Sequence, residues 1–293
     1  MSRLPKLLTT LALGAAMSFA ATSALAQHGP PPPGHGGPHH GEEGEESEYP
    51  VSYVERPLTL SRLTLAPELE LSVVRESPFV ASVNAHPPAE AVAGLSLGAT
   101  FGITRDFEIS AVVLPLELNA ANENGQRTFR YGSPILGATF RFYHSHVLEV
   151  GARLQGTIYT ESGATGALIT PSVPLLFHLG TRARIDTGVA LPITARAGTT
   201  STGLQIPFAL AVDVIEPFHL GVNTGLVFED IGRSTAAGIP LGFFGGWAFG
   251  RHKPIVDLDA FFRWDSLVTP NGNEKFEAGV YEVGLAAKAY LYF

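Results

Sequence analysis

The last eleven residues of the chain, Val283-Gly284-Leu285-Ala286-Ala287-Lys288-Ala289-Tyr290-Leu291-Tyr292-Phe293, alternate between two kinds of side chain. Every odd-numbered residue is apolar, whereas the even-numbered residues are small, polar or amphipathic. Because side chains along a β-strand point alternately to its two faces, this period of two predicts a strand with one apolar and one wet face. The strand ends the chain on an aromatic residue, Phe293.

This ending resembles the terminal strand signal of Gram-negative outer-membrane β-barrels. The resemblance implies a barrel that its C-terminal strand closes, surrounded by outer-membrane lipid. It also implies that Phe293, Leu291 and Tyr290 form an assembly signal for the barrel-assembly machinery. The segment Glu55-Arg56-Pro57-Leu58-Thr59-Leu60 looks like the lead-in of poorly characterised porin-like barrels, which implies a channel by analogy only.

The N-terminus independently predicts export. Arg3 and Lys6 precede an apolar run over residues 7–20, and Ala24-Leu25-Ala26 is a small-x-small cleavage site. This pattern is typical of a secretory signal peptide, here residues 1–26, rather than of a membrane anchor. After Gln27 no stretch reaches the roughly 18 apolar residues that a membrane-spanning helix needs.

A separate segment follows at residues 27–50, which is rich in Pro, Gly and His and then in Glu. Such a composition cannot bury a core and predicts a disordered periplasmic arm. His35, His39 and His40 are weak candidates for binding a transition metal. Their spacing is irregular, so a solvated tail is the favoured interpretation and no metal site is predicted.

Composition narrows the class of protein further. The chain has no cysteine, 32 glycines and 45% hydrophobic residues, but only 16% charged residues. Soluble domains usually carry about a quarter charged residues, so this balance favours a barrel wall, which needs apolar side chains on alternate positions only. The formal net charge of -8 argues against nucleic acid as a partner.

The period-two pattern recurs about every twenty residues across the predicted barrel, residues 51–293. Short connections alternate with longer ones, as between the periplasmic turns and external loops of bacterial outer-membrane barrels. The sequence therefore predicts an all-β, transmembrane, antiparallel up-and-down barrel of about 12 strands with both termini periplasmic. The predicted strands cover residues 63–75, 91–103, 107 onward, 135–143, 147–159, 166–179, 183–193, 204–214, 218–229, 239–249, 255–265 and 279–293.

Prolines interrupt this pattern, although a closed barrel has no free edge that tolerates a missing N–H. We expect them at bulges or at frayed strand ends on the external rim. Pro67 suggests that the first strand starts after it. The interrupting prolines are Pro115, Pro171, Pro174, Pro192, Pro207 and Pro240.

Charged residues on the wet face of the predicted strands are candidates to line the lumen. The candidates include nine acids and six bases, and this excess of acids predicts a mild cation preference if the lumen conducts. The alternative is an ion-pair lattice that maintains the barrel's shape, with Arg141 near Glu149 and Arg263 near Glu282. The candidates are Glu68, Glu70, Arg75, Glu108, Arg141, Glu149, Arg153, Arg184, Asp186, Asp213, Asp257, Asp259, Arg263, Glu282 and Lys288.

Many glycines share this wet face, and they leave space for a narrow pore or a ligand cavity. The leading hypothesis is a narrow porin or diffusion channel for small solutes. The alternative is a non-conducting structural or ligand-binding barrel. A third, an outer-membrane lipid hydrolase, needs a Ser–His pair at the lipid boundary, whereas His178 and His219 are predicted to face the lumen. No enzymatic activity and no cofactor is predicted.

Overall fold

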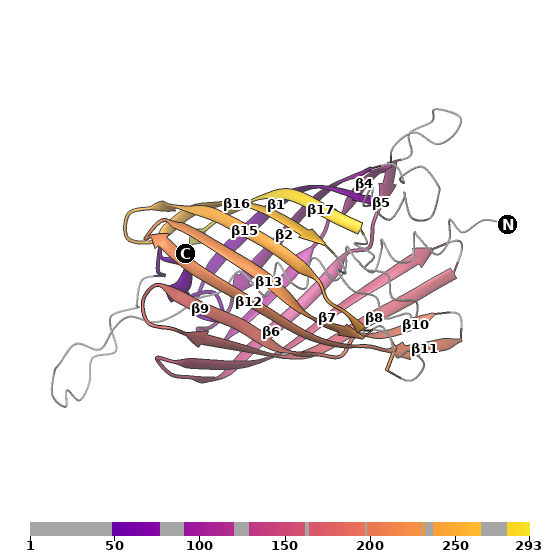
Figure 1. The fold of residues 1–293 in the computed structure, drawn as a ribbon, viewed down its shortest axis with the longest axis horizontal. Helices are drawn as coiled ribbons and strands as arrows, with labels where there is room; N and C mark the ends of the chain where they lie inside the picture. The colour runs from indigo at the N-terminus through magenta and orange to yellow at the C-terminus, as the bar shows by residue number, and fades with distance from the viewer. Residues whose placement is uncertain are drawn as a thin grey trace.

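The computed structural model describes residues 49–76, 91–119, 129–161, 164–196, 198–228, 230–231, 237–264 and 280–293. Its strands run side by side, inclined to a common long axis, and form one continuous antiparallel sheet (Figure 1). They are β1 (Thr64–Glu76), β2 (Val92–Gly102), β3 (Phe107–Val112), β4 (Leu116–Asn119), β5 (Phe129–Tyr131), β6 (Ile135–His144), β7 (Leu148–Glu161), β8 (Ala164–His178), β9 (Ala183–Ala190), β10 (Ile193–Arg196), β11 (Thr199–Thr202), β12 (Leu204–Ile215), β13 (Phe218–Phe228), β14 (Ala237–Gly238), β15 (Leu241–Gly250), β16 (Pro254–Trp264), β17 (Val280–Ala289) and β18 (Leu291–Tyr292).

These segments make twelve strands, because six strands are each divided into two parts. β3 and β4 both pair with β2, β9 and β10 with β8, β14 and β15 with β13, and β17 and β18 with β1. In the same way β5 continues β6, and β11 continues β12. The closed twelve-stranded antiparallel barrel that the sequence predicts is confirmed.

The last strand closes the ring against the first. The register of β1 and β17 sets Glu68 opposite Lys288 and Val73 opposite Val283. At the very end of the chain, the Phe293 amide donates a hydrogen bond of 3.1 Å to the Leu63 carbonyl. No free sheet edge remains at this seam, since β1 pairs with β2 on its other side.

The two faces of the wall differ as the alternation predicts. Leu71, Ile158 and Leu285 point outward and are 51%, 68% and 60% exposed, which forms the apolar band expected to face lipid. The inward positions between them are largely buried. A twelve-stranded barrel without lumenal contents would leave such positions open to water, so their burial requires that something fill the lumen.

Prolines mark the breaks within strands. Pro115, Pro192 and Pro240 lie between β3 and β4, β9 and β10, and β14 and β15. Others, such as Pro174 and Pro207, lie inside β8 and β12. Pro67 lies within β1, so the expectation that the first strand starts after it is wrong.

Two connections that the sequence predicts as loops are mostly strand. β7 extends to Glu161 and β8 begins at Ala164, where a loop over 160–165 was expected. Between residues 194 and 203, β10 and β11 form a hairpin that prolongs the wall. Thr and Ser dominate β11, and such residues suit a solvated strand as well as they suit a loop.

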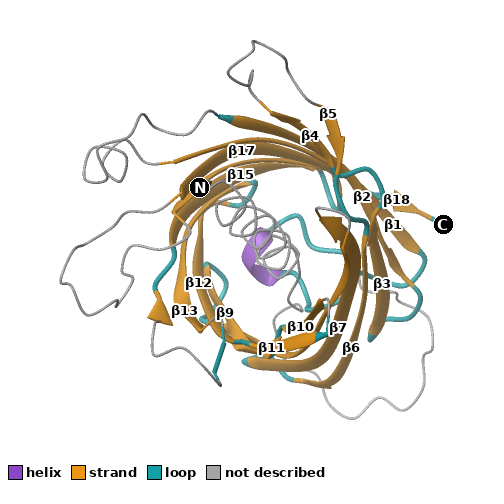
Figure 2. Ribbon diagram, turned by 90° about the vertical axis from the view of Figure 1, so that its right-hand side faces the viewer, coloured by secondary structure: helices purple, strands orange, loops and turns teal. Residues whose placement is uncertain are grey.

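The fourteen residues before Leu63 lie inside the barrel, and we call residues 49–62 the lumenal segment. Figure 2, a view along the barrel axis, shows its single-turn 3₁₀ helix η1 (Tyr53–Glu55) within the ring of strands. The chain enters β1 through a sharp reversal at Leu63, whose φ of 55° is in the left-handed region. No helix among the described residues is long and apolar enough to cross a membrane.

Residues 51–62 fall within the predicted barrel, residues 51–293, but the sequence predicts no strand for them because they lack the period of two. Tyr49 and Pro50 were placed in the predicted arm, but they belong to the lumenal segment, where Tyr49 is 2% exposed. The predicted signal peptide at 1–26, the remainder of the arm and its candidates His35, His39 and His40 lie outside the described residues.

Candidate functional site: the occupied lumen

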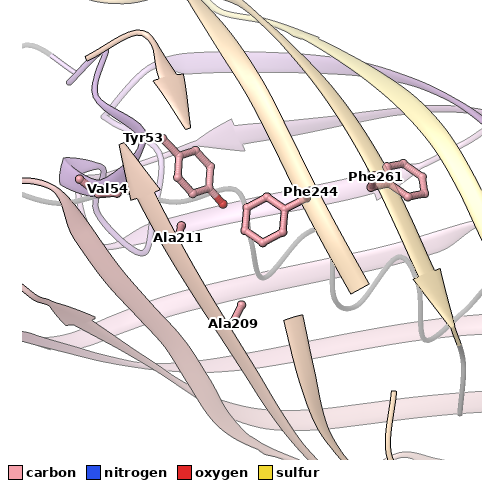
Figure 3. Close-up of a cluster of buried hydrophobic side chains, with 6 residues drawn as sticks. All are labelled: Tyr53, Val54, Ala209, Ala211, Phe244 and Phe261. Carbon is pink, nitrogen blue, oxygen red and sulfur yellow. The ribbon is translucent and has the colours of Figure 1, made fainter. Parts of the chain in front are cut away.

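An apolar cluster anchors η1 to the wall. Figure 3 shows the Tyr53 ring directed toward Phe244 of β15, with Ala209 and Ala211 of β12 beside them. Val54 and Phe261 complete the cluster. Phe244 and Phe261 occupy inward positions that alternate with outward apolar ones, and the centre of the Tyr53 ring lies 6.3 Å from that of Phe244. This part of the lumen therefore contains a small hydrophobic core.

Arg56 is the main polar anchor of the segment. Its guanidinium forms a two-point ion pair with Asp257 of β16, with Nη2 at 2.9 Å from Oδ1 and Nη1 bonded to Oδ2. Tyr290 donates a hydrogen bond of 2.6 Å to the same Asp257 carboxylate. The remaining Arg56 N–H groups reach the carbonyls of Pro50 and Val51, so the charge is satisfied although its side chain is only 1% exposed.

A second buried arginine, on another part of the wall, also holds the segment. Arg184 of β9 is fixed by a two-point ion pair with Asp186, at 2.7 and 2.8 Å. Its Nη1 donates to the Tyr53 carbonyl at 3.1 Å and to the Arg56 carbonyl at 3.4 Å. The guanidinium also lies 4.6 Å from the centre of the Tyr53 ring, within the range of a cation–π contact.

Wall carboxylates accept from the backbone of the segment. The Leu58 amide donates to Glu149 at 2.8 Å and the Leu60 amide to Glu108 at 3.1 Å. Ser52 donates through its hydroxyl to Asp213 at 2.7 Å. A buried chain without regular secondary structure leaves its backbone polar groups unpaired, and here side chains of the wall supply the missing partners.

Two histidines complete this set of contacts. His178 of β8 has Nδ1 at 3.1 Å from the Val54 carbonyl and Nε2 at 3.4 Å from Glu149. The His219 ring of β13 stacks on Tyr53 with centroids 4.0 Å apart, and its Nε2 lies 3.2 Å from Asp259. Both imidazoles are therefore inside the barrel and against the segment, instead of at the lipid boundary where a lipid hydrolase needs them.

Burial shifts the titration of the segment's own side chains. Burial raises the pKa of the Tyr53 hydroxyl above its usual range, so the ring stays neutral. Burial disfavours the charged form of Arg56, but Tyr290 and Asp257 beside it hold the pKa of the guanidinium above its ordinary value. The Arg56–Asp257 contact is therefore between two full charges at any physiological pH.

Several other predicted lumen residues form ion pairs along the wall. Two pairs that the sequence predicts are present, Arg141 with Glu149 at 3.0 Å and Arg263 with Glu282 at 3.1 Å. Lys288 pairs with Glu68 at 2.9 Å across the closing seam, and Glu70 is inward and 5% exposed. Arg153 lies 4.0 Å from Glu108.

Arg75 is the exception among the predicted lumen residues. It has the parity of Leu71 and Val73 in β1, and like them it is exposed on the outward face. The register sets it beside Tyr281, near the end of β1 that leads into the long connection. The lumen assignment was therefore wrong, because strict alternation along β1 excludes it.

The inward glycines make room for side chains rather than for a wide pore. A Cβ on Gly221 would collide with the Phe244 ring, and one on Gly284 with the Phe261 ring. One on Gly242 would collide with Asn223. Around these glycines, the space that the sequence predicts for a pore or cavity is thus occupied by aromatic and polar side chains.

A cavity of about 160 Å³ remains on the long-connection side of the segment, with Leu58 among its lining residues. Inward polar groups such as Arg153 and Asn223 line it together with Val189 and Phe208, whose side chains belong to the outward face. The pairing of β9 with β12 has a gap. Thr187 pairs with Phe208 and Ala190 with Gln205, but the residues between these two pairs are not paired. The cavity thus passes between these strands, where Pro207 has no N–H to donate.

Comparison with solved structures agrees with this architecture. An outer-membrane channel from Pseudomonas putida F1 superposes with a TM-score of 0.54 at 9% identity, covering 86% of this chain and 100% of that one. The NanC porin gives a TM-score of 0.49 at 8% identity, covering 75% of this chain and 98% of that one. The translocator domain of the autotransporter NalP from Neisseria meningitidis gives 0.47 at 9% identity, covering 79% and 89%.

No protein-family model matches the sequence, and no curated protein matches it. At these identities the structural likeness shows the fold alone. The chain has the closed β-barrel fold that is also seen in these outer-membrane proteins.

Proposed function

We propose that the protein is an outer-membrane channel for small solutes that its own lumenal segment closes. The observation that carries this proposal is the set of contacts around residues 49–62, which bind six or more wall strands through side chains rather than through strand pairing. Such contacts are individually breakable without disturbing the wall. A purely structural filler would be expected to join the sheet or to pack as a continuous apolar core.

Conductance in planar bilayers tests the proposal. The wild-type barrel should show small or infrequent current steps, whereas Arg56→Ala, which removes the main anchor, should show larger or more frequent ones. Arg62→Ala is the matched control, since Arg62 is an exposed arginine at the end of the same segment. Silence of both the wild type and Arg56→Ala, with folding verified by heat-modifiable migration, would favour the non-conducting structural barrel.

The cation preference predicted from the sequence takes a narrower form in this proposal. Asp257 is neutralised by Arg56, and Glu149 accepts hydrogen bonds from the segment, so neither is a free pore charge while the channel is closed. Asp259 is 32% exposed and is the better candidate to set the field. The preference should accordingly emerge when the segment has left the lumen.

A second candidate function, suggested by the cavity, is passage of apolar or amphipathic solutes. The cavity has outward side chains such as Val189 and Phe208 at one side and Arg153 at the other, a lining that suits an apolar body with a polar end. Ala190→Phe should fill it and reduce binding of a fluorescent naphthylamine probe by barrels in nanodiscs. Ala260→Phe, on the outward face, is the control; equal binding by both variants would count against this candidate.

The proposal also includes an orientation. The segment lies at the end of the barrel that carries the short turns, since its contacts include the Arg105 carbonyl in the turn before β3. Short turns are periplasmic in bacterial outer-membrane barrels. We therefore place the start of β1, the C-terminus and the lumenal segment on the periplasmic side. Assembly by the barrel-assembly machinery through Phe293, Leu291 and Tyr290 belongs to the same proposal.

A further inference from the structure

His178 lies between two hydrogen-bond acceptors. One is the Val54 carbonyl of the lumenal segment, at 3.1 Å from Nδ1, and the other is the Glu149 carboxylate of the wall, at 3.4 Å from Nε2. A neutral imidazole carries one N–H and one bare nitrogen, so it can donate to only one of them. The imidazolium carries both N–H groups and is the form that satisfies both acceptors.

Glu149 cannot relieve this conflict by donating a proton of its own. It already accepts from the Leu58 amide at 2.8 Å and from the Arg141 guanidinium at 3.0 Å. These donors favour the ionised carboxylate. The proton that the arrangement requires therefore belongs on His178, and the Val54 carbonyl is its acceptor only while the segment is in place.

The charges around His178 come from four elements. Glu149 of β7, Asp186 of β9 and Glu55 of the segment favour the imidazolium, whereas Arg184 of β9 opposes it. Arg184 is bound to Asp186, and the opposing Arg141 of β6 is bound to Glu149 and Asp106, so both guanidinium charges are locally compensated.

His219 makes a contact of the same kind. Its ring is stacked on Tyr53, Asp259 of β16 lies 3.2 Å from Nε2, and Asp213 of β12 is opposite it in the register. Arg56 and Arg184 lie 5.7 and 4.6 Å from the centre of the Tyr53 ring, and each is paired with its own carboxylate. A proton on His219 would strengthen both the contact with Asp259 and the attraction to the Tyr53 ring.

We propose that His178, assisted by His219, is a proton-sensitive latch that holds the lumenal segment in place at acidic pH and loosens it as the pH rises through neutrality. The docked segment takes up a proton that the released segment does not require. Docking is therefore strongest where histidine is ordinarily protonated, below about pH 6.5, and weakens above it. The inference rests on the segment being the channel's closure, but its test follows the segment itself.

The natural absence of cysteine allows a direct measurement. Leu58→Cys, at a side chain 3% exposed, reports release of the segment through its reaction with a polar, membrane-impermeant maleimide. Thr181→Cys, in an exposed turn, measures how the labelling rate of an always accessible cysteine depends on pH. The ratio of the two rates should rise on the order of tenfold between pH 5.5 and 8, the range over which an exposed histidine loses its proton.

Variants of His178 decide whether this residue carries the effect. His178→Gln should give a ratio that is already high at pH 5.5 and rises much less with pH, because only His219 and Glu55 still respond, and His178→Arg should give a low one. His144→Gln, which removes an exposed histidine at the end of β6, should leave the wild-type profile unchanged. A ratio that is constant with pH in the wild-type background overturns the proposal, as does a wild-type profile in His178→Gln. If His178→Gln fails to fold by heat-modifiable migration, a wild-type profile in His178→Arg overturns it. Because labelling needs no ion flow, failure of conductance alone leaves this test intact.

Discussion

Leu58 fills the space that Gly151 leaves in the wall. A Cβ on Gly151 would lie 2.6 Å from Leu58 Cδ2, closer than two carbon atoms approach without displacement. The two residues come from the lumenal segment and from β7, and the Leu58 amide is bonded to Glu149 two residues before Gly151. The absence of a side chain at one position in the wall therefore sets where the segment can dock.

Gly151→Val should displace the segment. The added atoms push against Leu58 and against the Phe140 carbonyl at 3.1 Å, and overpacking of this kind costs roughly 1–3 kcal/mol. We expect more frequent channel opening in bilayers. Adding Leu58→Ala should restore closure if the clash is with the segment; no restoration would assign the effect to the wall instead.

The Arg56–Asp257 pair should behave as a coupled unit. Removing one member leaves a buried uncompensated charge, which costs roughly 3–5 kcal/mol, whereas removing both costs less than the sum. Arg56→Met, Asp257→Asn and the double variant should therefore show non-additive losses in thermal stability and in closure. Additive effects in this double-mutant cycle would mean that the two groups do not interact.

Glu55 should add to the pH dependence of docking. Burial, followed by Asp213 and Glu216, raises the pKa of this carboxyl in the docked segment. A raised acid pKa means that docking is unhindered below the ordinary glutamate value of about 4.3 and weakens as the pH rises through the docked value. Glu55→Gln should therefore strengthen closure above that range in bilayer recordings and have no effect at lower pH. Weaker closure in the variant would show that ionised Glu55 stabilises docking instead of weakening it.

Selectivity should depend on Asp259 once the channel is open. In an Arg56→Ala background, Asp259→Asn should shift the reversal potential in a salt gradient toward anions, because it removes a partly exposed lumenal charge. Asp106→Asn, near the turn before β3, is a control at the periphery of the lumen. An unchanged reversal potential would place the constriction elsewhere.

Deletion of Phe293 should impair assembly. Its side chain is 77% exposed on the outward face, so it contributes little to packing, yet its amide bonds to Leu63 at the seam. We expect folded protein in the outer membrane to fall and periplasmic aggregate to increase, as measured by fractionation and heat-modifiable migration. Phe249→Ala, which removes an outward aromatic from β15, provides the comparison. Normal levels after the deletion would remove the basis for the signal.

Much of the wall could be predicted from sequence, because alternation such as that of Val283 to Phe293 is a local property. The lumenal segment could not, since Arg56 and Leu58 find their partners on Asp257 and Glu149, far away in the chain. One signal was present: the inward faces of the strands were assigned more acids than bases. Arg56 supplies one cation that partly offsets this excess of acids. Moving Arg75 to the outer face makes the excess on the strands larger.

The lumenal segment contacts strands around the ring, namely β3, β7, β8, β9, β12 and β16. A ring of strands alone resists stretching along its circumference but offers little resistance to being flattened. Radial ties fix the separation of opposite walls, so the roundness of this barrel's cross-section depends on a segment that contributes no strand to it. When the lumenal segment leaves, we expect the ring of strands to become more deformable. Opening would then change the mechanics of the wall as well as the width of the passage.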